Sequence, residues 1–286
     1  MIFALINNKV LVPAFKNILL PVDLSSNTNL AVSKATELID EDGASIHLMH
    51  VIKSKKKNGN GLSEQGSQLS QLKSDIEKKV PGTVVHISLT SARNIENAIE
   101  EKAIELKPEL IIVAKQSDRK FFSFKKTISP GSLAKRTKCA VLTAKPGSLD
   151  NKIKSIVIPV QSGIPKRKLE LLMPLAWKKN TTVYLVSMLN KLKNSDNYDS
   201  SVSHTLVETY RLLKTGVNCQ IFHRLISGNN IARTALYFAE SVNADILVVN
   251  PEETTISSLA GLDISDMLMR NSKLQLLTIS PDKINI

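Results

Sequence analysis

Ile18-Leu19-Leu20-Pro21-Val22 decides the fold of this chain, because it returns as Ile156-Val157-Ile158-Pro159-Val160 in the second half of the sequence. Each copy is a short run of mostly branched apolar residues. The first copy is followed directly by turn formers, Asp23-Leu24-Ser25-Ser26. A run of this length and composition is typical of a strand that is buried on both faces. The sequence therefore predicts two similar halves, each beginning with a buried strand.

The repeat continues beyond these two strands. The spacing between copies falls only from 138 to 135 residues, so the copies differ by short insertions in loops. This period is far longer than the roughly 20–50 residues of a solenoid repeat and matches an ordinary domain. We therefore predict domains at residues 1–148, with a core from about residue 16, and 149–286, with a linker at 148–151. Further matching segments are residues 91–106 with 227–242, 110–113 with 246–249, and 138–146 with 273–281.

Strand and helix patterns alternate within each half. Strands are predicted at residues 17–22, 45–52, 84–89, 110–113 and 139–144, and again at 155–160, 182–188, 218–226, 246–249 and 275–279. Helices are predicted around residues 30–39, 69–80, 95–106, 166–179 and 230–242, and polar loops at 53–66 and 190–201. Ser129-Pro130 predicts a capped helix with proline at its first position. Because parallel strands need crossover connections, this order predicts an α/β fold of two domains, each a five-stranded parallel sheet flanked by helices.

The composition agrees with two compact domains in a reducing compartment. Of 286 residues 42% are apolar, and the two cysteines, Cys139 and Cys219, lie in strand-like runs at positions that do not correspond. A disulfide framework needs more cysteines at patterned spacings, so both are predicted to be buried free thiols. Residues 1–15 lack a basic leader and contain Asn7-Asn8-Lys9, a pattern that indicates neither a signal peptide nor a membrane anchor. We expect a cytoplasmic protein without a transmembrane segment.

The net charge of +12 is uneven, since residues 1–148 contain 22 Lys and Arg against 14 Asp and Glu. Such an excess favours nucleic acid, anionic lipid or nucleotide phosphate as partners, although a solvated basic surface also explains it. The densest part is residues 115–126, where five basic residues surround Phe121, Phe122 and Phe124. This loop suits single-stranded nucleic acid or a membrane surface. In the favoured interpretation, the phenylalanines fill the space beneath the loop and the lysines stay in water.

The order of strands and turns resembles the universal stress protein family in its tandem two-domain form. Residues 16–25 resemble the family's opening strand and turn, and His47-Leu48-Met49-His50-Val51 resembles its second strand. Residues 107–113 and 139–142 resemble the fourth and fifth strands. The resemblance spans residues 16–281 and implies an adenine nucleotide alpha hydrolase-like fold.

Domains of this family commonly pair through their fifth strands. The resemblance therefore implies that residues 139–144 and 275–279 meet and make one chain an internal pseudo-dimer. Association with protein partners, or self-association through fifth strands, is expected for the same reason, because exposed edge strands need to be covered.

Some members of the family bind ATP and others do not. In the binders an aspartate after the first strand contacts the base. A pattern of Gly, two residues, Gly, nine residues and Gly-Ser/Thr follows the fourth strand and wraps the phosphates. Glycine lets backbone N–H groups approach phosphate, and the next helix N-terminus adds a favourable dipole. The implied site lies at the carboxyl edge of the sheet.

In the first half, Asp23 matches this aspartate, but the three glycines are missing. Gly131-Ser132 would replace the final pair only with a loop four residues longer, and Pro130 favours a helix already begun. Asp23 alone is also explained as a turn or cap residue. The resemblance thus implies a degenerate nucleotide crevice near Asp23, Val51, Ala114, Ser117, Thr127, Gly131 and Ser132.

In the second half, Gln161 replaces the aspartate. The glycine positions hold Asn250, Glu253 and Asp263-Ile264. Glu253 would bring negative charge towards phosphate, which is unfavourable for that ligand. We predict that the second domain does not bind ATP in the family's manner.

Sequence motifs for metal binding or catalysis are not found. His47 and His50 face opposite sides of a strand because they are three residues apart, and His86, His204 and His223 form no ligand cluster in the sequence. Nucleophile, Rossmann and Walker motifs are also missing. No metal site and no catalytic residues are expected.

The resemblance to the universal stress protein family implies a stress-response or regulatory protein that binds partners, and the missing catalytic motifs predict that it is not an enzyme. No cofactor is expected. Two alternatives remain open: a switch in which the first domain binds ATP and hydrolyses it slowly, and a basic-loop binder of an anion, nucleic acid or membrane surface. Any small ligand is expected in the first domain near Asp23, Val51 and Ala114.

Overall fold

The computed structural model describes residues 5–6, 9–10, 15–39, 42–53, 59–115, 128–161, 163–176, 180–189, 200–228, 230–251, 255–257, 262–264, 268 and 272–280. The first half contains β3 (Asn17–Val22), α1 (Ser26–Leu38), β4 (Ser45–Lys53), α2 (Gly59–Lys79), β5 (Val84–Ala92), α3 (Ile95–Leu106), β6 (Leu110–Ala114), α4 (Pro130–Thr137) and β7 (Ala140–Ala144). The second contains β8 (Ser155–Pro159), α5 (Lys166–Ala176), β9 (Thr182–Leu189), α6 (Ser200–Gly216), β10 (Gln220–Ser227), α7 (Ile231–Ser241), β11 (Ile246–Val249) and β14 (Gln275–Thr278).

Three short elements complete the described secondary structure. They are a hairpin of β1 (Leu5–Ile6) and β2 (Lys9–Val10), a turn of 3-10 helix at Pro146–Ser148, and a ladder of β12 (Thr255–Ser257) with β13 (Leu262–Asp263). Among the described helices, none is both long and apolar enough to cross a membrane.

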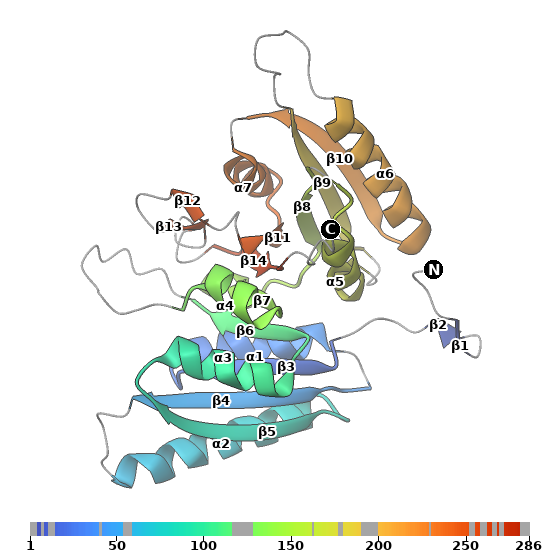
Figure 1. The fold of residues 1–286 in the computed structure, drawn as a ribbon. Coiled ribbons are helices and arrows are strands. Elements are labelled where there is room, and N and C mark those ends of the chain that lie inside the picture. The colour runs from blue at the N-terminus through green and yellow to red at the C-terminus, as the bar shows by residue number, and fades with distance from the viewer. Residues whose placement is uncertain are drawn as a thin grey trace.

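The strands form one ten-stranded sheet with the order β10-β9-β8-β11-β14-β7-β6-β3-β4-β5. Within each half all neighbouring strands are parallel, which confirms the predicted α/β architecture. The first strand of each half lies in the middle of its five, because successive crossovers proceed first to one side and then to the other. Figure 1 shows the two halves meeting at β7 and β14, the first half in blue and green and the second in yellow to red.

The two fifth strands pair with each other, as the family resemblance implied, and the structure shows that they run antiparallel. Leu142 lies opposite Leu277, with Val141 opposite Thr278 on one side and Thr143 opposite Leu276 on the other. This internal seam occupies the fifth-strand edges, so β5 and β10 are left as the outer edges of the sheet. Self-association through fifth strands therefore takes place within one chain.

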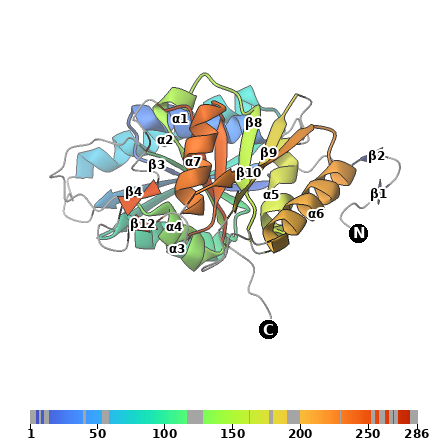
Figure 2. The same ribbon diagram turned by 90° about the horizontal axis from the view of Figure 1, so that it is seen from above.

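Helices cover both faces of the sheet (Figure 2). On one face α1, α2, α5 and α6 pack over a single apolar core that crosses the seam and includes Leu142 and Leu277. On the other face α3 and α4 cover one core, and α7 covers a second. Cys139 and Cys219 are buried free thiols, as predicted, and burial raises the pKa of both.

One predicted element is wrong in its extent. Residues 53–66 were expected to form a polar loop, but α2 begins at Gly59. The side chains of Ser63 and Glu64 are exposed, whereas Leu69 further along α2 is fully buried. The polar composition thus indicated exposure to solvent, and it did not exclude a helix whose later turns pack on the sheet.

Candidate functional site

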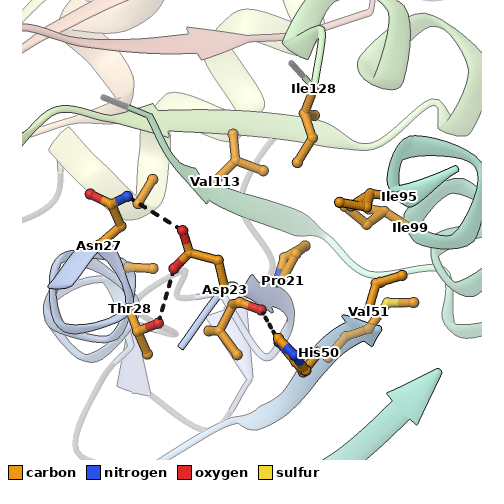
Figure 3. A pocket seen from close by; sticks show the side chains of 14 residues that line it. Pro21, Asp23, Asn27, Thr28, His50, Val51, Ile95, Ile99, Val113 and Ile128 are labelled. Carbon is orange, nitrogen blue, oxygen red and sulfur yellow. Dashed lines mark hydrogen bonds between the residues drawn. The ribbon is translucent and has the colours of Figure 1, made fainter. Parts of the chain in front are cut away.

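A crevice of about 380 Å³ opens at the carboxyl ends of β3, β4 and β6 in the first half. β3 has β6 on one side and β4 on the other, so the strand order reverses here. Open α/β sheets place ligands at such a point because the loops diverge. The lining residues are Pro21, Val22, Asp23, Asn27, Thr28, Ala31, Met49, His50, Val51, Ile95, Ile99, Val113, Ala114 and Ile128 (Figure 3).

Asp23 lies at the rim of the crevice and holds the start of α1. Its Oδ1 accepts hydrogen bonds from the Ser25 backbone N–H at 3.0 Å and from the Ser25 hydroxyl at 2.6 Å. Asp23 also accepts two longer hydrogen bonds of 3.4 Å, at Oδ2 from the Asn27 side-chain amide and at Oδ1 from the Thr28 hydroxyl. The arrangement is that of an Asx turn leading into a helix, since Ser25 in turn caps α1 by accepting from the Asn27 N–H.

This network favours the ionised form of Asp23. Burial, the largest single cause, acts to raise the pKa of the carboxyl, but hydrogen bonds from Ser25 and Asn27 together hold the pKa below its ordinary value. Among the described residues, Oδ2 accepts a hydrogen bond only from the Asn27 side-chain amide, at 3.4 Å. One carboxylate oxygen therefore remains able to accept a strong hydrogen bond from a ligand.

Two further features shape the polar side of the crevice. Leu24 has a φ of 57°, a left-handed conformation that is uncommon for a branched side chain and concentrates at functional sites. His50 Nδ1 lies 2.8 Å from the Val22 carbonyl, so that nitrogen donates and carries a proton. His50 thereby ties the end of β4 to the end of β3.

The remaining walls are apolar and come from both sides of the strands. Met49 and Val51 extend from β4, Val113 from β6, and Ile95 and Ile99 from α3 (Figure 3). A cavity with apolar walls and a few polar groups at one end is typical of sites for small, partly flat ligands. The geometry thus suits a ligand that buries an apolar body and offers a hydrogen-bond donor to Asp23.

The structure gathers some of the residues named from the sequence and separates others. Asp23, Val51 and Ala114 line the crevice. Ser117 and Thr127 lie outside the described residues. Gly131 and Ser132 belong to the first turn of α4, where Gly131 is buried and Pro130 is the first helical residue, and neither lines the crevice.

The N-terminus of α4 is already occupied by protein groups. The Ser132 N–H donates to the Ser129 hydroxyl at 3.3 Å, which confirms the predicted cap. The Ser129 N–H donates to Glu96 Oε2 at 3.2 Å, and Arg136 pairs with the other oxygen of Glu96 at 2.7 Å. A carboxylate therefore lies where a phosphate would need the helix dipole, and it repels phosphate.

Sequence reasoning missed Glu96 and His50 as parts of this region. Glu96 is in the first turn of α3, so its sequence position indicated only favourable charge at that helix end. Its contact with α4 depends on how two helices pack. His50 was named only as part of the second strand and as a histidine that cannot share a metal with His47, although an imidazole buried in an apolar strand signals a hydrogen bond.

The second half retains the framework of the crevice but not its aspartate. Gln161 follows β8, and its amide nitrogen is buried without a hydrogen-bond partner among the described residues. Ser187 donates to the Val160 carbonyl, in the place where His50 contacts Val22. Asn250 directly follows β11, Ile264 is buried, and Glu253 lies outside the described residues.

Two other predictions concern cations. In the part of the chain that the structure describes, no group of three or more His, Cys, Asp or Glu residues could hold a metal ion. Of the basic and aromatic residues at 115–126, only Lys115 is described, and it is 8% exposed. The favoured interpretation placed the lysines of this loop in water. For Lys115 that expectation is wrong, because its side chain is buried.

Comparison with known proteins relates the first half to a sequence family and the whole chain to a known fold. A sequence profile of the universal stress protein family matches residues 14–145. A search of curated proteins finds no match. Among solved structures, a universal stress protein from Archaeoglobus fulgidus is 15% identical with a TM-score of 0.67, and the match covers 94% of this chain and 98% of that one.

Two more structures share the arrangement of both halves. A protein of unknown function from Pseudomonas aeruginosa is 17% identical, with a TM-score of 0.57 and coverage of 95% and 94%. The cytoplasmic domain of a prokaryotic cation chloride cotransporter is 12% identical, with a TM-score of 0.54 and coverage of 95% and 98%. At such low identity these matches show the fold alone. The first half of the chain, residues 14–145, thus matches the universal stress protein family in sequence, and the chain as a whole is similar in fold to tandem structures such as the one from Archaeoglobus fulgidus.

Proposed function

We propose that this protein is a cytoplasmic regulatory protein that acts by binding partners, and that neither half holds ATP in the manner of the family's ATP binders. The single observation that carries the proposal is the closed N-terminus of α4. The Ser132 N–H is engaged by the Ser129 hydroxyl, the N–H of the cap residue Ser129 is engaged by Glu96, and Glu96 adds negative charge at that point. A triphosphate in this position would meet a carboxylate instead of free N–H groups.

The strand ends support the same proposal. Ala114, at the end of β6, stands where the ATP binders have the first glycine, and its side chain lines the crevice. In the second half Gln161 replaces the aspartate that contacts the base. In the first half the contacts to phosphate are thus weakened by the loss of the glycine at Ala114. In the second half the contact to the base is weakened, because Gln161 replaces the aspartate.

One observation favours a second candidate, a nucleotide switch in the first half. The crevice lies at the reversal of strand order, and Asp23 Oδ2 retains capacity for a donor such as an exocyclic amine. Such a ligand would use the apolar walls and Asp23 but not α4. Under this alternative an adenosine group binds, and its phosphates add little affinity.

Native mass spectrometry of the purified full chain, combined with a phosphate-release assay on Mg²⁺-ATP, tests the proposal. We expect no bound nucleotide and no phosphate release above a blank. One ATP per chain, or turnover that disappears in Asp23→Ala, would overturn the proposal in favour of the switch. The matched control is Asp150→Ala, which removes a carboxylate in the linker, away from the crevice residues.

A further inference from the structure

Two histidines far apart in the sequence meet at the outer edge of the first half. His47 on β4 lies directly opposite His86 on β5, because the two strands pair in parallel register. Their rings stack with centroids 4.8 Å apart and an interplanar angle of 17°. The sequence shows no ligand cluster around His86, because the register that joins these two residues depends on the folded sheet.

We propose that His47 and His86 form a two-histidine site for a divalent transition ion that prefers imidazole, such as Zn²⁺. Opposite residues on adjacent strands project from the same face of the sheet, and the strands lie about 4.8 Å apart. Zinc–imidazole bonds of about 2.0–2.1 Å require the two nitrogens to lie roughly 3 Å apart. His86 is exposed, so its ring is able to tilt towards that geometry without disturbing the core.

The ring nitrogens have capacity for an ion. The Ser45 hydroxyl lies 3.2 Å from His47 Nε2 and orients that ring. No other hydrogen bond to either ring is found in the described part of the chain. Imidazole is the commonest protein ligand for such ions, and water would complete the coordination because the described residues supply no third His, Cys, Asp or Glu ligand.

The charges on α3 nearly cancel at this position. Lys102 and Glu105 both interact electrostatically with His47, and they pair with each other at 2.8 Å. The positive charge of Lys102 opposes a bound cation, whereas Glu105, whose side chain is 62% exposed, favours it. The charges on α3 therefore have little net effect on metal binding, and the two imidazoles determine the affinity for the ion.

The second half provides an internal comparison. In the same register Tyr184 on β9 lies opposite Phe222 on β10, and the two rings are stacked with centroids 5.6 Å apart. Phe238 of α7 contacts Tyr184 edge-on. The fold thus accepts a pair of rings without ligand nitrogens at this position, so two imidazoles are not needed for packing. The histidine pair gives the first half a chemistry that the second half lacks.

Zinc titration of the full-length chain, followed by competition with a chromophoric chelator, tests the proposal. The variants His47→Tyr and His86→Phe copy the residues of the second half, so both are expected to fold. Their circular dichroism and melting curves establish this independently. His223→Phe is the control, because His223 also packs on an aromatic ring, Tyr210, but lies opposite Leu185 on β9 and not opposite a histidine.

We expect one Zn²⁺ per chain for the wild type and for His223→Phe, and binding at least about tenfold weaker in either test variant, because the second imidazole binds intramolecularly. Zinc should also shift the imidazole ¹⁵N resonances of His47 and His86 together. The proposal is overturned if the wild type does not bind zinc, if either test variant binds as tightly as the wild type, or if the resonances that respond belong to other histidines. None of these outcomes depends on whether the crevice binds a nucleotide.

Discussion

A carboxylate before the fourth strand secures the first strand in each half. In the second half Asp245 Oδ2 accepts from the backbone N–H groups of Lys154 and Ser155 at 2.9 and 3.0 Å, and Oδ1 accepts from Lys273 at 2.9 Å. In the first half Glu109 accepts from the N–H of Lys16 at 2.6 Å. Asp245 is 5% exposed, whereas Glu109 is exposed. Asp245 should therefore contribute more than Glu109 to the free energy of unfolding.

We predict that Asp245→Asn lowers the free energy of unfolding by about 3 kcal/mol at neutral pH, since it removes a buried charge from its partners. Glu109→Gln is the matched control and should cost about 1 kcal/mol or less, because solvent screens an exposed carboxylate. Urea denaturation of both variants measures the difference. Equal losses would contradict the importance given to burial.

The cost of Asp245→Asn should also depend on pH. Burial acts to raise the pKa of Asp245, but hydrogen bonds from Lys273, Lys154 and Ser155 hold it below the ordinary value of 3.8. A carboxyl with a lowered pKa stabilises the fold fully above its unfolded pKa and loses that contribution as pH falls through the folded pKa. The difference between wild type and variant should therefore be constant above about pH 5 and shrink below pH 4 in urea titrations. A difference that grows on acidification would contradict this assignment.

The predictability of single residues depended on whether their partners are close in the sequence. Ser129 as a cap and Asp23 as a turn residue were accessible, because their partners lie within five residues. The contact between Glu96 and Ser129 spans 33 residues and requires α3 and α4 to be packed. Long-range contacts of this kind have no local signal.

At the scale of elements, both halves use the same helix signals. Asn94 caps α3 by accepting from the N–H groups of Glu96 and Asn97, and Asn230 caps α7 by accepting from Arg233. Just beyond the same two helices, Lys107 and Asn243 adopt left-handed conformations with φ of 46° and 51°. Asparagine tolerates this conformation better than lysine does.

Lys107→Gly is predicted to raise the free energy of unfolding by about 0.5–1 kcal/mol, because glycine adopts a positive φ without steric cost. The matched control is Glu101→Gly, at an exposed position inside the same helix, which should lower stability by about 1 kcal/mol. Both are measured by urea denaturation. A loss of stability in Lys107→Gly would show that the lysine side chain, and not its backbone, matters at this helix end.

The element pattern was predicted closely where apolar runs are short and bounded. β3 begins and ends where the sequence placed it, and the other sheet strands agree to within a few residues. The start of α2 was missed because its first turns are polar and glycine-rich, and such turns carry no apolar periodicity. Strand boundaries are marked by burial on both faces, whereas an exposed helix start has only its caps.

At the scale of the whole molecule, we expect the seam to make the two halves one cooperative unit. Leu142 and Leu277 face each other across β7 and β14, and both belong to the core that runs under α1 and α5. Because one apolar core crosses the seam, neither half can lose its structure without exposing the other's fifth strand.

Leu277→Ala, at a residue that is 2% exposed, should therefore reduce the stability of the whole chain by about 3 kcal/mol in a single transition. Differential scanning calorimetry checks this through the ratio of calorimetric to van't Hoff enthalpy, which should stay near one. Leu236→Ala, in the separate core under α7, is the control and should also shift one common transition. Two resolved transitions in either variant would contradict a single unit.

The repeat revealed the architecture of the whole molecule, and the family resemblance implied the internal pairing of fifth strands. The chemistry of the crevice was less accessible, since it depends on which residues from β3, β4, β6 and α3 converge there. The histidine pair at the outer edge had no signal in the sequence, because it is created by the register of two strands 39 residues apart.

A thermal-shift titration of the full chain with ATP, ADP and AMP at physiological salt tests the central claim most directly. That claim is that the first half does not bind ATP in the manner of the family's ATP binders. A ligand that binds only the folded state raises the melting temperature with its concentration. We predict no saturable rise of the melting temperature with ATP up to millimolar concentration, either in the wild type or in Asp23→Ala. A saturable rise for ATP that exceeds the rise for AMP and disappears in Asp23→Ala would contradict the proposal and establish a nucleotide site in the crevice.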